Sequence, residues 1–348
     1  MSEYAELLRE QGARLFEREA SRAGGADANE AEIPGSLWDA IEAAGLCDVM
    51  VAEEAGGAGA GLVEALVLAR LAGAHAAPVP LVETILVRWM LASLGRRAPT
   101  GPASLAILRN PEGRQVALPG VPWGRAAATL IAFVPAGDGW EMRALDPRRA
   151  EIDRNTNLAG EPRDLLRFDA RAFAEAATTL VDPELMPGGP LALLALFRAA
   201  QMTGAMASAL DIAVRYAGER VQFGRPISRF QAVQQIIAAM AGDIAASTCA
   251  TDAAALAPPD AMEIMISAAK ARTGEAAGRV AAGAHQVLGA MGYTREHRLH
   301  RYTRRLWAWR DEAGNEVHWQ ENLFRLIAQT GTDPWHVLAP LGAETAVN

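Results

Sequence analysis

Apolar residues recur at helical spacing in two stretches of the chain, separated by a segment with a different pattern. From residue 4 to about 95 they return every three or four positions, as expected for amphipathic helices. Ser36 is expected to cap one of these helices, which would end at Gly45. Two more are predicted over 62–71 and 81–94.

Between residues 96 and 187, prolines and glycines separate short apolar runs, which is typical of strands. Strands are predicted over 104–108, 129–134 and 141–145. The helical pattern then returns in long, alanine-rich segments that are apolar on more than one face, as in a helix bundle. These helices are predicted over 191–219, 230–255, 261–291 and 312–329.

The predicted fold is therefore mainly α with a small central β domain. It comprises an N-terminal helical domain (1–95), a β domain (96–187) and a C-terminal four-helix bundle (188–348). The length of 348 residues agrees with two or three domains.

Composition narrows the classes of function. With 51% apolar and 21% charged residues the chain is expected to fold, and its net charge of −8 argues against an extended nucleic-acid surface. The arginines between 295 and 310, interleaved with Tyr302, Trp307 and Trp309, are therefore not expected to bind nucleic acid. Two cysteines without a CxxC pair make no disulfide framework.

Membrane and metal sites are not expected either. Arg198 and Gln201 interrupt the longest apolar run, and the chain opens without a basic stretch followed by an apolar one. This predicts a cytoplasmic protein without a membrane span. His297 and His300 have no evident third ligand nearby, so no metal site is predicted.

The first informative stretch runs from Tyr216 to Ile227 and is followed by Phe230 and Gln231. The planar guanidinium of Arg220 suits a phosphate, Gln222 adds an amide and Phe223 a flat apolar face. The alternative is a helix–turn–helix in which Phe223 packs inward and Arg220 is solvated.

The second stretch runs from Gln286 to Thr294 and is followed by Arg301-Tyr302-Thr303-Arg304. Small residues at 289, 290 and 292 allow another chain or a ligand to approach the backbone closely. The alternative is that these glycines simply end a helix.

In this order and at this distance, and together with the glycine-rich run 51–59, the two stretches resemble the acyl-CoA dehydrogenase family across the whole chain. The resemblance implies flavin adenine dinucleotide (FAD) bound between subunits of a dimer or a dimer of dimers. It also implies an acyl-CoA substrate, an electron-transferring flavoprotein as acceptor, and a role in β-oxidation of lipids or steroids. The residues that it places on the dinucleotide are Arg220, Gln222, Phe223 and Gln231, with Gln286 and Gly289 on another helix.

The chain departs from the family's pattern at the flavin ring. The family's middle domain carries a Thr-Glu-Pro…Gly-Ser-Asp loop and a Trp-Ile-Thr strand that grip the ring. Here residues 103–111 read Ala-Ser-Leu-Ala-Ile-Leu-Arg-Asn-Pro, no Gly-Ser-Asp follows, and Trp123 precedes Gly124 and Arg125. The resemblance thus implies a chain without its own ring clamp.

The position of the catalytic base also differs from the family's pattern. The family uses a glutamate in a Glu-Gly-Thr element, and an ungapped count puts Ala313 there, with Glu312 one residue early. On a helix one residue is a rotation of about 100°. Glu312 is the candidate base, and the alternative is an acidic residue at a helix start. Some family members place the base on the long helix that enters the C-terminal domain. The matching position here is Leu194, which carries no carboxylate.

Three hypotheses follow. The chain is a subunit of a heteromeric acyl-CoA dehydrogenase that shares its flavin site with a homologous partner. Alternatively, it is a self-sufficient homomeric dehydrogenase that uses Glu312, or a flavin-free structural or binding member of the family.

Overall fold

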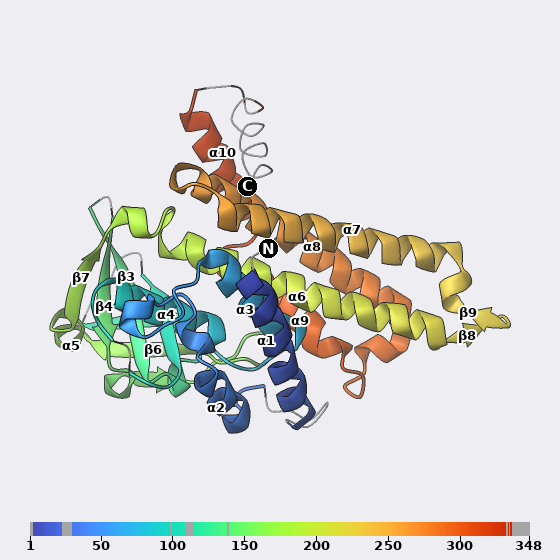
Figure 1. The fold of residues 1–348 in the computed structure, drawn as a ribbon, viewed down its shortest axis with the longest axis horizontal. Helices are drawn as coiled ribbons and strands as arrows, with labels where there is room; N and C mark the ends of the chain where they lie inside the picture. Colours follow the sequence, from blue (N-terminus) through green and yellow to red (C-terminus); the bar gives the residue numbers. More distant parts are fainter. Residues whose placement is uncertain are drawn as a thin grey trace. The chain divides into compact units, whose positions relative to one another are not determined.

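The computed structural model describes residues 3–22, 30–97, 99–108, 114–137, 139–331, 333 and 335. The chain forms two units, shown together in Figure 1. The first comprises 1–19, 29–68 and 78–193, and the second comprises 20–28, 69–77 and 194–348. Along the chain, helices are followed by strands and then by helices again, so the prediction of a mainly helical fold with a small β part is confirmed.

The helices of the N-terminal part are α1 (Glu3–Arg22), α2 (Gly35–Ala43), α3 (Leu62–Ala74) and α4 (Leu81–Ser93). The prediction that Ser36 caps α2 is wrong. The helix begins at Gly35, directly after Pro34, and no side chain makes a capping hydrogen bond. Pro34 has a φ of −64°, close to the value at which the proline ring fixes the backbone, so the chain enters α2 without a polar cap.

The strands of the first unit form two sheets, ordered β1-β3-β4-β7 and β2-β6-β5. Leu118 and Leu166 on the three-stranded sheet and Leu130 on the four-stranded sheet are fully buried in one apolar core, which also includes Phe173 of the short helix α5 (Ala170–Ala174). The three predicted strands are confirmed as β1, β3 and β4. The strands are β1 (Ala103–Ile107), β2 (Gln115–Pro122), β3 (Thr129–Ala136), β4 (Gly139–Leu145), β5 (Glu151–Asp153), β6 (Arg163–Asp169) and β7 (Ala177–Val181).

Long helices make up most of the second unit. Among them, α7 and α8 are antiparallel: Met240 of α7 lies against Gly283 of α8, and Asp243 of α7 pairs with Arg272 and Arg279 of α8. The predicted helix over 312–329 begins later, at Glu316, and a separate helix precedes it. The helices are α6 (Gly189–Glu219), α7 (Gln231–Leu256), α8 (Pro259–Leu288), α9 (Leu299–Asp311) and α10 (Glu316–Gln329).

Two glycines set the contact between α3 and α6 in the second unit. A Cβ atom on Gly73 of α3 would lie 1.9 Å from the carbonyl oxygen of Gln201, and one on Gly204 of α6 would lie 2.0 Å from that of Arg70. The Ser208 hydroxyl donates to the carbonyl of Ala74 at 2.6 Å, further along the same contact. The helices therefore touch backbone to backbone, which only glycine permits.

The segment 183–219, which contains α6, is long and apolar enough to cross a membrane by length and composition. However, 83% of its most apolar window is buried inside the protein, as in the core helix of a bundle.

Candidate functional site

A short hairpin connects α6 to α7. Its strands are β8 (Val221–Gln222) and β9 (Arg225–Pro226), and the turn residues Phe223 and Gly224 have φ values of 51° and 76°. Positive φ at both central positions defines a type I′ turn, where asparagine followed by glycine is preferred. A phenylalanine in this conformation is a backbone outlier, and such strain is retained mainly at functional positions.

The Phe223 ring is 92% exposed, so the interpretation in which it packs inward is wrong. It forms a T-shaped ring pair with Phe230, with centroids 6.0 Å apart, and the Arg225 guanidinium lies 4.4 Å from the Phe230 centroid. The hairpin thus presents an aromatic ring and an arginine to the outside, and burying Phe223 is not what stabilises the chain.

We expect Phe223→Asn to raise the free energy of unfolding of the isolated chain by about 1 kcal/mol, because asparagine tolerates positive φ. Phe223→Leu is the matched control, since leucine shortens the exposed apolar side chain without relieving the backbone. Urea denaturation of the three proteins measures the difference. Destabilisation by Asn, or an equal gain from Leu, contradicts the interpretation.

Arg220 lies directly after the last residue of α6 and is exposed. Its carbonyl accepts a hydrogen bond from the Ile227 amide at 2.8 Å, which closes the base of the hairpin. Within the described part of the chain, its guanidinium makes no hydrogen bond or ion pair. Gln222 bonds only the carbonyl of Val221, at 2.9 Å. Arg220 therefore has its donors available to an anion from outside the chain.

The antiparallel register brings the two informative stretches to the same end of the α7–α8 pair. Because Met240 lies against Gly283, Gln231 at the start of α7 lies within about 10 Å, along the helix axis, of Gln286 and Gly289. All three are exposed. Gly289 ends α8 with φ 59° and ψ −141°, a conformation essentially restricted to glycine. The hairpin lies at this end of the α6 and α7 helices (Figure 1).

The structure adds His285, which the sequence reading did not single out although it precedes Gln286. Its ring is buried and stacked between Tyr293 and Trp307, with centroids 4.4 and 5.7 Å away. Nε2 lies 3.0 Å from the Thr303 hydroxyl, whereas Nδ1 is buried without a hydrogen-bond partner. Burial lowers the pKa of His285, which favours the neutral ring.

Glu312 follows the C-terminus of α9, so the interpretation that it starts a helix is wrong. Its Oε2 accepts a hydrogen bond from Nε of Arg198 at 2.9 Å, and the two side chains are 19% and 3% exposed. Nη1 of Arg198 also donates to the amide oxygen of Gln201. The two polar residues that interrupt the apolar pattern of α6 therefore form a buried cluster with Glu312.

Lys270 of α8 fixes the loop that carries Glu312. Its Nζ is fully buried and donates to the carbonyl oxygens of Arg310, at 2.8 Å, and of Gly314, at 2.6 Å. Nε1 of Trp319 donates to the carbonyl of Ala313 at 2.8 Å. Burial lowers the pKa of Lys270 to about 7, although the nearby Glu312 carboxylate opposes this shift.

The loop around Glu312 carries no carboxylate that is open to a substrate. A general base needs a carboxylate that can turn to the substrate, and the Glu312 carboxylate is engaged by a buried guanidinium. Ala313 has no acceptor on its side chain, and Leu194 is buried and apolar. The cluster of Glu312, Arg198 and Lys270 is arranged to hold the loop in place.

Trp123 lies in the β part with only 3% of its surface exposed, so it belongs to the core. Residues 103–107 form strand β1, whereas 109–111 lie outside the described residues. Tyr302 and Trp309 are buried too, which removes two of the three rings that could have stacked on nucleic-acid bases. Among the residues that the structure describes, no group of three His, Cys, Asp or Glu side chains is placed to hold a metal ion.

Comparison with known proteins extends over nearly the whole chain. The acyl-CoA dehydrogenase N-terminal domain matches residues 2–98, and the acyl-CoA dehydrogenase C-terminal domain matches 190–319. Acyl-CoA dehydrogenase IpdE2 of Mycolicibacterium smegmatis is 32% identical over 315 residues, covering 88% of this chain and 93% of that protein. IpdE2 of Mycobacterium tuberculosis is 30% identical, covering 87% and 91%.

Two solved structures share the fold at lower identity. A variant of the Tcur3481–Tcur3483 steroid ACAD superposes with a TM-score of 0.80 and 24% identity, covering 94% of this chain and 99% of that one. The ChsE4–ChsE5 complex from Mycobacterium tuberculosis gives a TM-score of 0.78 at 21% identity, covering 94% and 98%.

Proposed function

Because this chain belongs to the acyl-CoA dehydrogenase family of oxidoreductases, we propose that it is one subunit of a heteromeric, FAD-dependent enzyme that introduces an α,β double bond into an acyl-CoA thioester. In this proposal it contributes residues to the dinucleotide end of the flavin. The flavin ring and the catalytic base belong to a homologous partner.

The observation that carries the proposal is the ion pair between Arg198 and Glu312. A subunit that removes the α-proton itself needs a carboxylate open to the substrate, and the carboxylate of this loop is bound to a buried arginine. Breaking this ion pair would take the carboxylate away from a buried arginine, which is costly inside a protein. This supports a structural role for the loop and, in this proposal, a catalytic base supplied by the partner.

The described residues fit the dinucleotide end of FAD. Arg220 has donors for a pyrophosphate, Phe223 offers a flat ring, and Gln231, Gln286 and Gly289 lie at the same end of the helices. When bound, FAD accepts the β-hydrogen of the substrate as hydride. The residues of this chain bind and orient its adenosine side, and the strained Phe223 turn presents the ring in advance.

The same arrangement predicts the assembly. Since Arg220 and Gln286 are exposed on their own chain, we expect them near a subunit boundary, with two flavins per four chains. The relatives support a partner of the same family, because two of the similar structures are named as pairs of proteins. A steroid-derived or other lipid thioester as substrate, electron-transferring flavoprotein as acceptor and a cytoplasmic location complete the proposal.

The visible spectrum tests it. The chain purified alone is expected to be colourless and to become yellow only when co-expressed with a complete homologue. Light scattering with flavin quantification is expected to give one flavin per two chains. A yellow protein from this chain alone, with one flavin per chain, favours the homomeric enzyme. A colourless complex favours the flavin-free alternative.

Arg220→Ala is expected to lower the affinity of the complex for FAD ten- to a hundredfold, since a charged hydrogen bond contributes about 1.5–3 kcal/mol. Folding is expected to be unaffected, because the side chain is exposed. Fluorescence titration of the deflavinated complex measures the change. Arg215→Ala, an exposed arginine five residues earlier on α6, is the control, and unchanged FAD affinity in Arg220→Ala counts against the assignment.

Glu312→Gln separates the heteromeric from the homomeric enzyme. In the heteromer, turnover by the complex is expected to stay within a few-fold of wild type, although thermal stability falls because Arg198 loses its charged partner. The homomeric alternative predicts loss of α-proton exchange, by several orders of magnitude, with FAD still bound. Exchange of the substrate α-proton in deuterated water distinguishes the two.

A further inference from the structure

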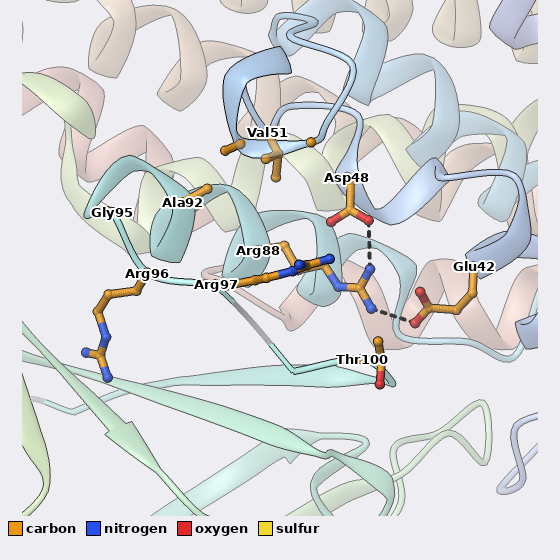
Figure 2. Close-up of a pocket in the computed structure, with 11 residues that line it drawn as sticks. Glu42, Asp48, Val51, Arg88, Ala92, Gly95, Arg96, Arg97 and Thr100 are labelled. Carbon is orange, nitrogen blue, oxygen red and sulfur yellow. Dashed lines mark hydrogen bonds and ion pairs between the residues drawn. The ribbon is translucent and has the colours of Figure 1, made fainter.

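We propose that a cavity of the first unit, far along the chain from the residues assigned to FAD, binds the phosphate or pyrophosphate group of a small metabolite. The cavity has a volume of about 350 Å3. Figure 2 shows it between the loop after α2 and the chain that leaves α4. Its polar lining includes Glu42, Asp48, Arg88, Arg96, Arg97 and Thr100.

Arg88 is the buried arginine of the cavity lining. Its side chain is 7% exposed, and it donates from Nη1 to Asp48 at 2.9 Å and from Nη2 to Glu42 at 2.5 Å, as the dashed lines in Figure 2 show. Its Nε–H is buried and has no hydrogen-bond partner. This N–H is closed off from the cavity as well as from water, so a ligand there would meet the charge of the Arg88 guanidinium, which Glu42 and Asp48 already share.

Two more arginines, Arg96 and Arg97, line the cavity. Neither Arg96 nor Arg97 has a side-chain hydrogen bond or ion pair with any residue that the structure describes. The lining therefore contains three arginines and two carboxylates, and both carboxylates are already paired with Arg88. In Figure 2 the Arg96 side chain points away from Glu42 and Asp48. In a chain of net charge −8, a local excess of positive charge around a cavity favours an anion.

The end of α4 does not account for the two arginines. Basic side chains near a helix C-terminus often bond its last carbonyls. Here backbone groups do so: the Gly95 amide donates to Ala92 at 2.9 Å and the Arg96 amide donates to Leu91 at 2.8 Å, with Gly95 at φ 68°. The guanidinium groups thus remain available for a ligand.

The lining also indicates the class of ligand. Arginine forks match the oxygens of phosphate, and the Thr100 hydroxyl can donate to the same group. A volume of about 350 Å3 is at the lower end of the range for metabolite sites, so the anion belongs to a small molecule. Free pyrophosphate and a nucleotide such as AMP both carry this anionic group. They differ in that the nucleotide also carries a sugar and a nucleobase, which can add affinity.

The test is isothermal titration calorimetry of the full chain, in the assembly in which it purifies, with pyrophosphate and with AMP. We expect saturable binding that weakens at least tenfold in the double variant Arg96→Gln/Arg97→Gln and is unchanged in Arg171→Gln, an exposed arginine that does not line the cavity. Tighter binding of AMP than of pyrophosphate identifies a nucleotide site, and the reverse identifies a diphosphate site.

Three results overturn the proposal. They are absence of binding by either compound at millimolar concentration, equal affinity in the double variant, and equal weakening in Arg171→Gln, which would indicate unspecific attraction. Because both substituted arginines lie at the surface of the cavity, the melting temperature without ligand is expected to stay within about 1–2 °C of wild type. FAD content, measured in parallel, is expected to be unchanged, so failure here is distinguishable from failure of the flavin assignment.

Discussion

Alanine at position 204 is expected to destabilise the chain by about 3 kcal/mol or more. Its Cβ would lie 2.0 Å from the carbonyl oxygen of Arg70, and that oxygen belongs to the backbone of α3, which cannot rotate away as a side chain can. The helices would have to separate, and that would expose the apolar surface buried between them. Gly73→Ala meets the carbonyl of Gln201 in the same way and is expected to have the same effect.

Gly218→Ala is the matched control on the same helix. Nothing lies within 4 Å of a Cβ at this position, so alanine is expected to add about 0.5–1 kcal/mol through its higher helix propensity. Thermal and urea denaturation of the three variants measure the effects. If Gly204→Ala is as stable as wild type, the helices do not touch as described.

Lys270→Met is expected to change how stability depends on pH. The unfolded lysine titrates near 10.5 and the folded one near 7, because burial disfavours its charge. Between these values the unfolded chain holds a proton that the folded chain has released, so stability rises with pH by up to about 1.4 kcal/mol per pH unit. Below pH 7 both states hold the proton and this dependence ends.

Methionine fills the space of the lysine stem without titrating, so the variant is expected to lack the slope. Its destabilisation relative to wild type is therefore expected to be larger at pH 9 than at pH 6.5. Burial raises the pKa of the Cys47 thiol to about 12, which gives an opposing slope above about pH 9. Both proteins carry this thiol, so its contribution cancels in the comparison. Equal destabilisation at both pH values would show that Lys270 keeps its charge.

A direct measurement is also possible. Lys270 is the only lysine among 348 residues, so a protein labelled with nitrogen-15 lysine gives one side-chain resonance. Its midpoint in an NMR titration is expected near 7. A neutral amine has two N–H donors, which is the number that the carbonyls of Arg310 and Gly314 require.

Periodicity predicted the long helices and three strands because those elements bury a regular stripe or face. It did not predict where α9 ends and α10 begins. The break at 312–315 depends on Nζ of Lys270, which is more than 40 residues away from Gly314 in the sequence, and on the Trp319 indole, and both donate to the loop carbonyls. A prediction that uses only neighbouring residues cannot detect these bonds. It therefore placed the start of the following helix at residue 312 instead of at Glu316.

The candidate site shows the same limit. The resemblance to the family implied roles for Arg220, Gln286 and their neighbours, and the antiparallel register of α7 and α8 places Gln231 near the second stretch. The state of Glu312 was not predictable, because its partner Arg198 is 114 residues away along the chain. In the sequence Arg198 only interrupted an apolar run, and its role became visible once the helix was placed beside the loop.

The burial of Lys270 also determines how the chain responds to chemistry directed at lysine. Acetylating reagents, amine-reactive cross-linkers and ubiquitin-conjugating enzymes modify lysine through an exposed ε-amine, and the one lysine of this chain is buried. In a complex with a lysine-containing partner, such reagents would mark lysines of the partner alone. Acylation of Lys270 would then record moments at which the loop around Glu312 opens, so its rate would measure local unfolding of that loop.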